Sequence, residues 1–248
     1  LFEALGAEPP VFAHIPLILN PDGSKMSKRD AGAGLQWYQD EGFLPEAVGN
    51  YLALLGWSPK DDREKLTIEE ITRLFDFDHL NRSNARFDLE KCTWLNGQHI
   101  AALPPEEFLT RAQPFAGDAS PAAVALTQPR IQRFTEITEW LEPILNDEHP
   151  LEPEAAAKLA SKPQTADLLR SLTARLAQSA EWKAKDIQLA ITETADEQEV
   201  KAGALMFPLR VTATGTSQGT DLMPTLEIIG KQATIARIEH RIAMIFAN

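Results

Sequence analysis

Residues 11–29 read VFAHIPLILNPDGSKMSKR, and this stretch decides the fold class of the N-terminal part of the chain. Residues 11–19 form a short apolar run with Ile and Val, which favours a buried strand over a helix. Residues 20–23, Asn-Pro-Asp-Gly, predict a tight turn, because Pro presets one turn dihedral and Gly tolerates positive φ. The basic loop at 25–29 therefore leaves the end of a buried strand, where open α/β sheets place their ligand sites.

The loop at 25–29 concentrates positive charge. Lys25, Lys28 and Arg29 are basic, in a chain whose formal net charge is −12. This concentration predicts that the loop handles a polyanion, while a solvated basic turn is the alternative that these five residues leave open. The chain also begins in the middle of an element, with one strand and no partner strand, so we expect most of a preceding α/β domain to be missing.

The bulk composition is that of an ordinary globular protein. With 248 residues, 44% of them apolar and 24% charged, the chain can form one large domain or two smaller ones. Its sequence has no apolar run of about 18 residues, so we expect no membrane partner. The single Cys92 excludes an internal disulfide framework, and the scattered histidines predict no metal site. The start has no basic-then-apolar leader, so we expect no secretory signal, and with the lone cysteine this fits a reducing cytoplasm.

The acidic balance weighs against RNA binding, because phosphate contacts need Lys and Arg. Basic residues nevertheless cluster at 25–29 and at 82–91, and further arginines follow in the C-terminal half. Net charge does not determine the local potential, so the objection lowers the expected RNA affinity of this chain alone and excludes nothing.

Helical periodicity dominates from residue 35 onward. A capping box at Thr67–Glu70 predicts a helix start, followed by a buried stripe of Ile68, Ile71, Leu74 and Phe75. Segment 209–214 alternates apolar and polar residues like a strand, but it would have no partner strand, so we predict a helix. The other predicted helices are 45–55 with Val48, Tyr51, Leu52 and Leu55 on one face, a helix capped by Asp88, a helix after Ser120-Pro121, then 131–141, 154–160, 166–177, 186–191 and a last helix after Gly230.

Five segments, taken together, resemble bacterial glutamyl-tRNA synthetases. Lys-Met-Ser-Lys-Arg at 25–29 resembles the signature loop of class I aminoacyl-tRNA synthetases, and residues 8–19 are similar to the strand that enters it. Residues 45–57 are similar to the helix just after that loop, and residues 87–97 match the junction to the anticodon-binding part. Residues 208–230 resemble the last helical module. In order and spacing the resemblance covers essentially the whole chain.

The resemblance implies a mainly all-α chain with an N-terminal remnant of an α/β Rossmann-like catalytic domain. Residues 1–34 would be the end of the catalytic domain, residues 35–98 a helical stem-contact and connecting region, and residues 99–248 a helical anticodon-binding domain. The helical C-terminal half favours the glutamyl branch over the glutaminyl branch, which carries β-barrel anticodon domains. Whether glutamine tRNA is also charged stays open.

The implied activity is ATP-dependent ligation of glutamate to tRNA(Glu) through glutamyl-adenylate, with Mg²⁺ accompanying ATP. Lys28 would contact the ATP phosphates, where an ammonium group stabilises the charge that builds on departing pyrophosphate. Lys25 and Arg29 would support the same field. Ser27 can offer a hydroxyl, and Met26 completes the signature loop.

Further site residues follow from the same resemblance. The backbone of Leu17 and Ile18 would lie beside the adenine, and Gly23 and Gly32 would let the loop close. Arg210 is the one residue that we predict to contact RNA. The other candidates, Trp94, Trp140 and Trp182 with Arg130 and Arg133, are more simply core or solvated side chains.

One departure from the family is large. The class I His-x-Gly-His signature is absent from the 248 residues, as are the glutamate pocket and the segment that grips the tRNA acceptor end. We therefore expect the isolated chain, a monomer, to be unable to aminoacylate tRNA. Two alternatives are a non-catalytic tRNA-binding module derived from a synthetase and a helical interaction domain.

Overall fold

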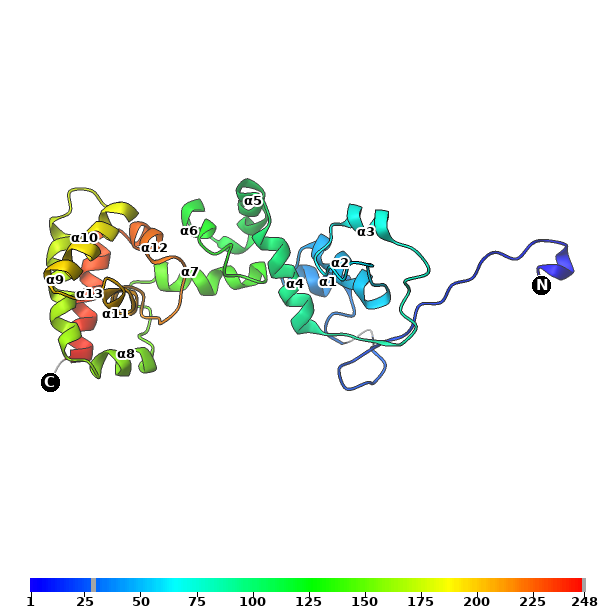
Figure 1. Cartoon of the computed structure of the whole chain (residues 1–248), viewed down its shortest axis with the longest axis horizontal. Helices are drawn as coiled ribbons and strands as arrows, with labels where there is room; N and C mark the ends of the chain where they lie inside the picture. The colour runs from blue at the N-terminus through cyan, green and yellow to red at the C-terminus, as the bar shows by residue number, and fades with distance from the viewer. Residues whose placement is uncertain (28–29, 247–248) are drawn as a thin grey trace. The chain divides into compact units, whose positions relative to one another are not determined.

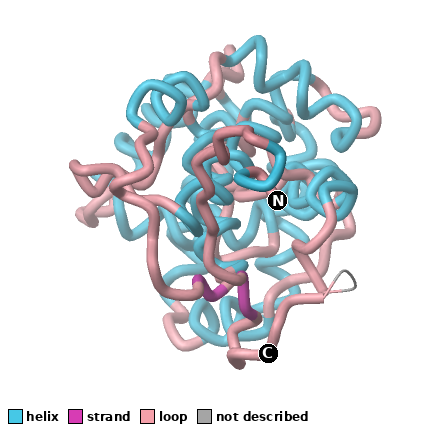
Figure 2. The backbone as a smooth tube through the Cα atoms, turned by 90° about the vertical axis from the view of Figure 1, so that its right-hand side faces the viewer, coloured by secondary structure: helices cyan, strands magenta, loops and turns pink. Residues whose placement is uncertain are grey.

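The structure is a computed structural model that describes residues 1–27 and 30–246 (Figure 1). It divides into two compact units, Leu1–Ala102 and Leu103–Asn248. Helices carry most of the described residues, and the sheet among them has two strands of two residues each (Figure 2). The prediction of a mainly all-α fold with a small α/β remnant is confirmed. No helix in the described ranges is long and apolar enough to cross a membrane.

The N-terminal unit is built around one parallel strand pair. β1 (Ile18–Leu19) pairs with β2 (Ala85–Arg86), which lies more than sixty residues further along the chain. The remaining elements of this unit are a 3₁₀ turn, η1 (Glu3–Leu5), and the helices α1 (Leu35–Asp40), α2 (Pro45–Gly56), α3 (Ile68–Leu74) and α4 (Leu89–Ala101). Its core gathers the buried side chains Tyr38, Phe43, Val48, Tyr51, Phe87, Cys92 and Leu95.

Predicted helix starts are observed with their capping bonds. Thr67 Oγ1 accepts from the Glu70 backbone N–H at 3.1 Å, and the Glu70 carboxylate accepts from the Thr67 N–H at 2.9 Å. Asp88 caps α4 through the Lys91 N–H at 3.0 Å. Each bond satisfies a backbone donor that has no partner inside its helix, which is why these short polar residues define the helix starts.

The buried strand predicted for residues 11–19 is wrong for most of its length. Only Ile18 and Leu19 are in a strand, while Val11 is fully exposed and Phe12 and Ile15 are each 69% exposed. An apolar run becomes a buried strand only where other residues cover it and pair with its backbone. In the described part of the chain, β2 meets this run only at its C-terminal end.

The buried stripe predicted for α3 is also wrong. Ile68, Leu74 and Phe75 are 43%, 36% and 45% exposed. α3 packs against α2, and Leu52 of α2, predicted to share one helix face with Val48 and Tyr51, is itself 39% exposed. An amphipathic pattern predicts which face of a helix is apolar and tends to be buried. In the described unit, other elements bury the apolar face of α3 only in part.

The C-terminal unit is entirely helical in the residues described. Its elements are α5 (Pro105–Ala116), α6 (Pro121–Ala125), η2 (Phe134–Glu136), α7 (Ile137–Leu145), α8 (Pro153–Ala160), α9 (Gln164–Gln178), α10 (Ala184–Glu197), α11 (Gly203–Thr214), α12 (Leu222–Ile229) and α13 (Lys231–Phe246). α13 packs against both α9 and α11, and the main core lies among α9 to α13 (Figure 1).

The ambiguous segment 209–214 is helical, as predicted. The hydroxyls of Thr212 and Thr214 donate to the carbonyls of Pro208 and Arg210, at 2.8 and 2.9 Å. These bonds satisfy buried hydroxyls inside a helix, so the alternation of polar and apolar residues did not require a strand. The helix predicted to begin at Ile131 begins at Ile137, after η2.

Candidate functional site

The basic loop begins in a hydrogen-bonded turn. The Asn20 N–H donates to the Ser24 carbonyl at 2.8 Å, and Gly23 has φ +88°. The Asp22 carboxylate accepts from the Ser24 hydroxyl and N–H, at 2.7 and 2.9 Å, and these bonds lower the pKa of Asp22. An antiparallel bridge between Leu19 and Lys25 then brings the chain back beside β1. The predicted turn is therefore present and fixes where the loop starts.

Asp30 holds the other end of the loop to this turn. Its carboxylate accepts from the Ser27 N–H at 2.7 Å and from Asn20 Nδ2 at 3.0 Å. These two bonds, with the Ser27 bond the larger cause, hold the pKa of Asp30 below its usual value. Sequence reasoning missed Asp30, although an acid immediately after a basic run was a visible signal.

Gly32 joins the loop to the aromatic core. Its φ is +77°, and a Cβ at this position would collide with the ring of Phe87. The Tyr38 hydroxyl donates to the Gly32 carbonyl at 2.8 Å, and burial raises the pKa of Tyr38. Only glycine satisfies both the backbone conformation and the packing.

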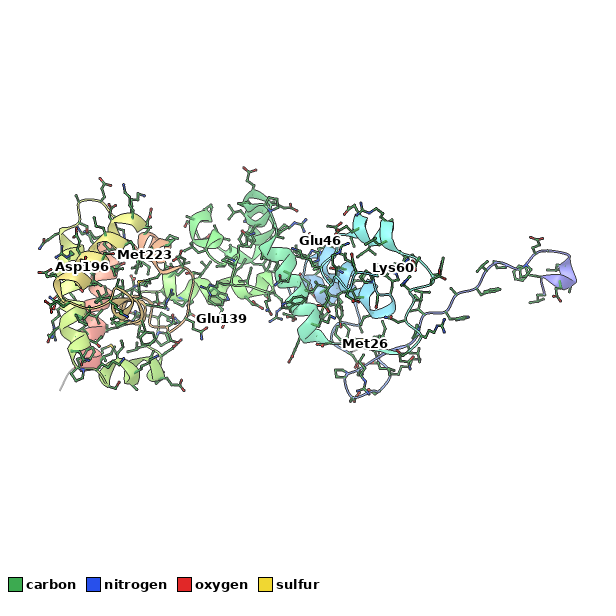
Figure 3. All side chains as sticks on the ribbon, in the orientation of Figure 1. Met26, Glu46, Lys60, Glu139, Asp196 and Met223 are labelled. Atoms are coloured by element: carbon green, nitrogen blue, oxygen red, sulfur yellow. The ribbon has the colours of Figure 1, made fainter. Side chains whose placement is uncertain are left out.

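The predicted loop residues have different environments. Lys25 and Ser27 are exposed, while Met26 is half-buried against the aromatic core (Figure 3). Lys28 and Arg29 lie outside the described residues, so the predicted phosphate contact of Lys28 stays a prediction. The exposed ammonium of Lys25 on this strand-to-loop bend suits the phosphates of a nucleotide.

The backbone predicted to lie beside adenine already has protein partners. Leu17 donates to Asn84 Oδ1 at 3.1 Å and accepts from the Ala85 N–H at 3.2 Å. The Ile18 carbonyl accepts from the Met26 N–H at 3.4 Å. These bonds tie the strand to both β2 and the loop, and the adenine contact stays a prediction.

A cavity of about 600 Å³ lies beside the loop. Asn20, Asp22, Asp30 and Phe87 are among its lining residues. Two carboxylates line this cavity and Lys25 does not. The cavity therefore does not suit a triphosphate, which the carboxylates would repel. Among the described residues, no three His, Cys, Asp or Glu side chains gather as metal ligands.

A second site surrounds Arg210 in the C-terminal unit. This Arg210 pocket has a volume of about 490 Å³ and lies between α7, the residues that follow it, and the end of α11 with its loop. Its lining residues are Glu139, Trp140, Glu142, Pro143, Ile144, His149, Glu152, Arg210, Thr214, Thr216–Thr220 and Thr225. Figure 3 labels Glu139 on α7.

Arg210 has a buried donor that lacks an acceptor. Its Nη1 atom is shielded from solvent and has no hydrogen-bond partner among the described residues. Burial, with Arg130 nearby, lowers the pKa of Arg210, and Asp221 opposes this shift. A Cβ on Gly219 would lie 2.6 Å from Nη1, so the loop passes directly over the guanidinium group. A buried unpaired donor is unfavourable unless a ligand supplies the acceptor.

Polar bonds hold the loop that forms the rim of the Arg210 pocket. The Thr216 hydroxyl donates to the Gln218 carbonyl at 2.7 Å, and the Ser217 N–H donates to Glu152 Oε2 at 2.8 Å. Gly215 begins the loop with φ +85°. Hydrogen bonds therefore hold the loop at the rim of the pocket in place.

The three tryptophans considered from sequence differ in role. Trp182 is structural, because its Nε1 donates to the Leu226 carbonyl at 2.8 Å. Trp94 is 40% exposed on α4, so it is not a core residue. Trp140, predicted to be a core residue, is half-buried and lines the Arg210 pocket. Trp140 and Arg210 are seventy residues apart in the sequence, and tertiary packing brings them together. Periodicity along a single helix cannot predict such a contact.

Two family models match the chain. The anticodon binding domain matches residues 107–242, and the catalytic domain of class I tRNA synthetases (E and Q) matches residues 1–94.

The chain is similar to glutamate–tRNA ligases. That of Akkermansia muciniphila is 47% identical over 245 residues, covering 96% of this chain and 56% of the relative. That of Thermus thermophilus is 36% identical, covering 98% of this chain and 53% of the relative. The crystal structure of a glutamate tRNA ligase from Elizabethkingia meningosepticum in complex with its amino acid matches with a TM-score of 0.84 at 30% identity, over 98% of this chain and 53% of that one. This chain thus spans about half the length of the curated relatives that it matches.

Proposed function

Since this chain belongs to the glutamate–tRNA ligase family of class I aminoacyl-tRNA synthetases, we propose that it supplies the signature loop and the tRNA-binding helices of an enzyme that joins glutamate to tRNA(Glu). ATP, with Mg²⁺, is the proposed energy source, and this chain's residues are proposed to act on its phosphates. We further propose that the chain is a cytoplasmic monomer.

The signature loop is proposed to stabilise the leaving pyrophosphate. When the glutamate carboxylate attacks the α-phosphorus of ATP, negative charge builds on the departing pyrophosphate. Lys28 is proposed to contact these phosphates, with Lys25 and Arg29 adding to the positive field and Ser27 donating a hydroxyl bond. The bonds of Asp30 to Ser27 and Asn20, and of Tyr38 to the Gly32 carbonyl, fix the described residues that flank positions 28–29, which supports this assignment because a preorganised site stabilises transition-state charge best.

The Arg210 pocket is proposed to receive an unpaired nucleobase of the tRNA anticodon loop. The observation that carries this proposal is the buried, unpartnered Nη1 of Arg210, for which a ring nitrogen or carbonyl of a base is a suitable acceptor. Trp140 offers a ring on which a base can stack. The lining carboxylates of Glu139, Glu142 and Glu152 repel a phosphate but can accept from an exocyclic amino group.

Binding of unmodified tRNA(Glu) transcript to the 248-residue chain tests the RNA proposal. We expect binding at low salt that weakens steeply as salt rises. Arg210→Ala should weaken it by about tenfold, whereas Arg170→Ala, at an exposed arginine of α9, should leave it unchanged. No binding by the wild-type chain at low salt would overturn the proposal.

The catalytic half of the proposal has its own test. We expect the 248-residue chain to form no glutamyl-tRNA and to show no glutamate-dependent exchange of pyrophosphate with ATP, because the His-x-Gly-His signature is absent from it. Measurable charging of tRNA by the purified chain would contradict this expectation.

A further inference from the structure

Two arginines of α13, Arg237 and Arg241, are buried although both are charged. Their exposed fractions are 6% and 4%, and they lie one helical turn apart. Burying two like charges side by side is unfavourable unless hydrogen bonds replace their hydration. Their partners therefore indicate what the burial accomplishes.

Arg237 joins the ends of two helices. Its Nη1 donates to the carbonyls of Pro143 and Ala213, at 2.9 and 3.2 Å, and its Nη2 donates to the Ile144 carbonyl at 3.0 Å. The Asp147 carboxylate accepts from Nε and Nη2, at 2.9 and 2.7 Å. One guanidinium group thus connects the last turn of α7 with the last turn of α11.

Arg241 makes a second connection of the same kind. Its Nη1 donates to the Thr212 carbonyl at 3.0 Å, and its Nη2 donates to the His149 carbonyl at 2.8 Å. Burial, with the neighbouring charge of Arg237, lowers the pKa of Arg241. A Cβ on Gly215 would lie 2.7 Å from the Pro150 carbonyl and 3.1 Å from Arg241 Nη2, so the two chain segments are in close contact here.

The two connected segments are the two walls of the Arg210 pocket. Pro143, Ile144 and His149 belong to one wall, which also carries Trp140. α11 and its loop form the other wall, with Arg210 and Thr214. α13 contributes none of the residues that line this pocket in the described chain, yet its arginines bond to both walls.

We propose that Arg237 and Arg241 are positioning residues that set the separation between the Trp140 wall and the Arg210 wall, and thereby the choice of base in the Arg210 pocket. This inference rests on the proposed RNA function of that pocket. Neither arginine contacts the base itself.

Arginine suits this role better than lysine. The last carbonyls of a helix lack intrahelical partners and form the negative end of the helix dipole. A guanidinium group presents five donors in a rigid planar fork, so it reaches two helix ends at once, whereas the ammonium of lysine is a point charge on a flexible stem. A lysine at position 237 would keep the positive charge but could not donate to the ends of α7 and α11 at the same time.

The test compares Arg237→Lys and Arg241→Lys with a matched control, Arg170→Lys, in the full 248-residue chain. Arg170 is an exposed arginine of α9 that pairs with Asp167 at 2.8 Å. The dissociation constant is measured for tRNA(Glu) transcript and for the same transcript with one anticodon base changed, at a temperature where circular dichroism shows each variant folded. We expect each α13 variant to bind the tRNA(Glu) transcript about tenfold more weakly, and the ratio of its dissociation constants for the two transcripts to move towards one. Arg170→Lys should keep the wild-type affinity and the wild-type ratio.

Two outcomes separate the inference from the proposed function. If the α13 variants melt at lower temperature but keep the wild-type ratio, the arginines are merely structural and the inference is wrong. If the wild-type chain binds neither transcript, the RNA proposal fails; the indole N–H signal of Trp140 then tests the positioning alone. That signal should shift in Arg241→Lys and not in Arg170→Lys, and an unchanged signal would refute the positioning role.

Asp147→Asn serves where a lysine variant does not fold. The Asp147 side chain is 74% exposed, so its replacement leaves the core intact while weakening the bond that orients Arg237. We expect a smaller loss of about threefold in the ratio. A wild-type ratio in this variant, with the variant folded, would overturn the inference.

Discussion

Single residues with unusual environments fix the ends of the signature loop. Gly32 has a positive φ and touches an aromatic ring where any side chain would collide. The Asp30 carboxylate accepts from two donors, the Ser27 N–H within the loop and Asn20 Nδ2 in the turn before it. Neither feature depends on the charged residues of the loop, so each can be tested without altering Lys25 or Lys28.

Gly32→Ala should destabilise the N-terminal unit by about 1–3 kcal/mol, because alanine is strained at this φ and its methyl group meets the ring of Phe87. Urea unfolding measures the change in the free energy of unfolding. Gly34→Ala is the control, since Gly34 has φ −118° and no described atom lies within 4 Å of a Cβ built there. Equal losses in the two variants would contradict the packing argument.

The Asp30 bonds should depend on pH in one direction. Because the pKa of this carboxyl is lowered from 3.8, its stabilising effect is complete above that value and is lost as the pH falls through the folded-state pKa. We expect the Ser27 amide proton signal to move upfield, as its bond to the carboxylate weakens, when the pH is lowered below about 4. In Asp30→Asn the same signal should not titrate; a titration that persists would mean that another group is responsible.

At the scale of elements, the sequence predicted well those features that depend on neighbouring residues alone, such as helix caps. Helices with caps, such as those begun by Thr67 and Asp88, and the helix at 209–214 are observed. The strand at 11–17 and the buried face of α3 failed, because burial depends on which other elements cover a face. The α13 arginines, and the place of Trp140 beside Arg210, were not predicted for a related reason: Arg237 contacts Pro143, which lies ninety-four residues earlier in the chain.

Asp88→Ala should lower the free energy of unfolding by about 1 kcal/mol, since α4 would lose the acceptor for its Lys91 N–H. Glu90→Ala is the matched control, because Glu90 is an exposed acid in the same first turn without that capping bond. Chemical denaturation followed by circular dichroism distinguishes the two. A loss in Glu90→Ala as large as that in Asp88→Ala would assign the effect to helix-dipole charge instead.

At the scale of the whole molecule, the two units each have a core of their own. Tyr51 and Leu95 belong to the first core, and Leu172 and Leu209 to the second. The Arg210 pocket and both α13 arginines lie in the second unit, so everything that the RNA proposal requires is within residues 103–248.

Residues 103–248 should therefore fold when expressed alone, with a single cooperative thermal transition and a tRNA(Glu) affinity within about threefold of the full chain. Calorimetry and the binding measurement check this expectation. A Leu209→Ala variant provides the control, because truncating this buried side chain should shift the transition of the isolated unit and of the same unit in the full chain alike. A non-cooperative melt of the isolated unit would show that its core depends on residues 1–102.

Cys92, the single cysteine of the chain, lies in the core of the N-terminal unit with 1% of its surface exposed. Burial, and then the nearby charge of Asp88, raise the pKa of its thiol to about 12, so the reactive thiolate is scarce in the folded state. A thiol-specific alkylating reagent should consequently modify this chain only when that core opens. The rate of alkylation therefore reports how often the unit that carries the signature loop opens, and the native cysteine serves as the probe.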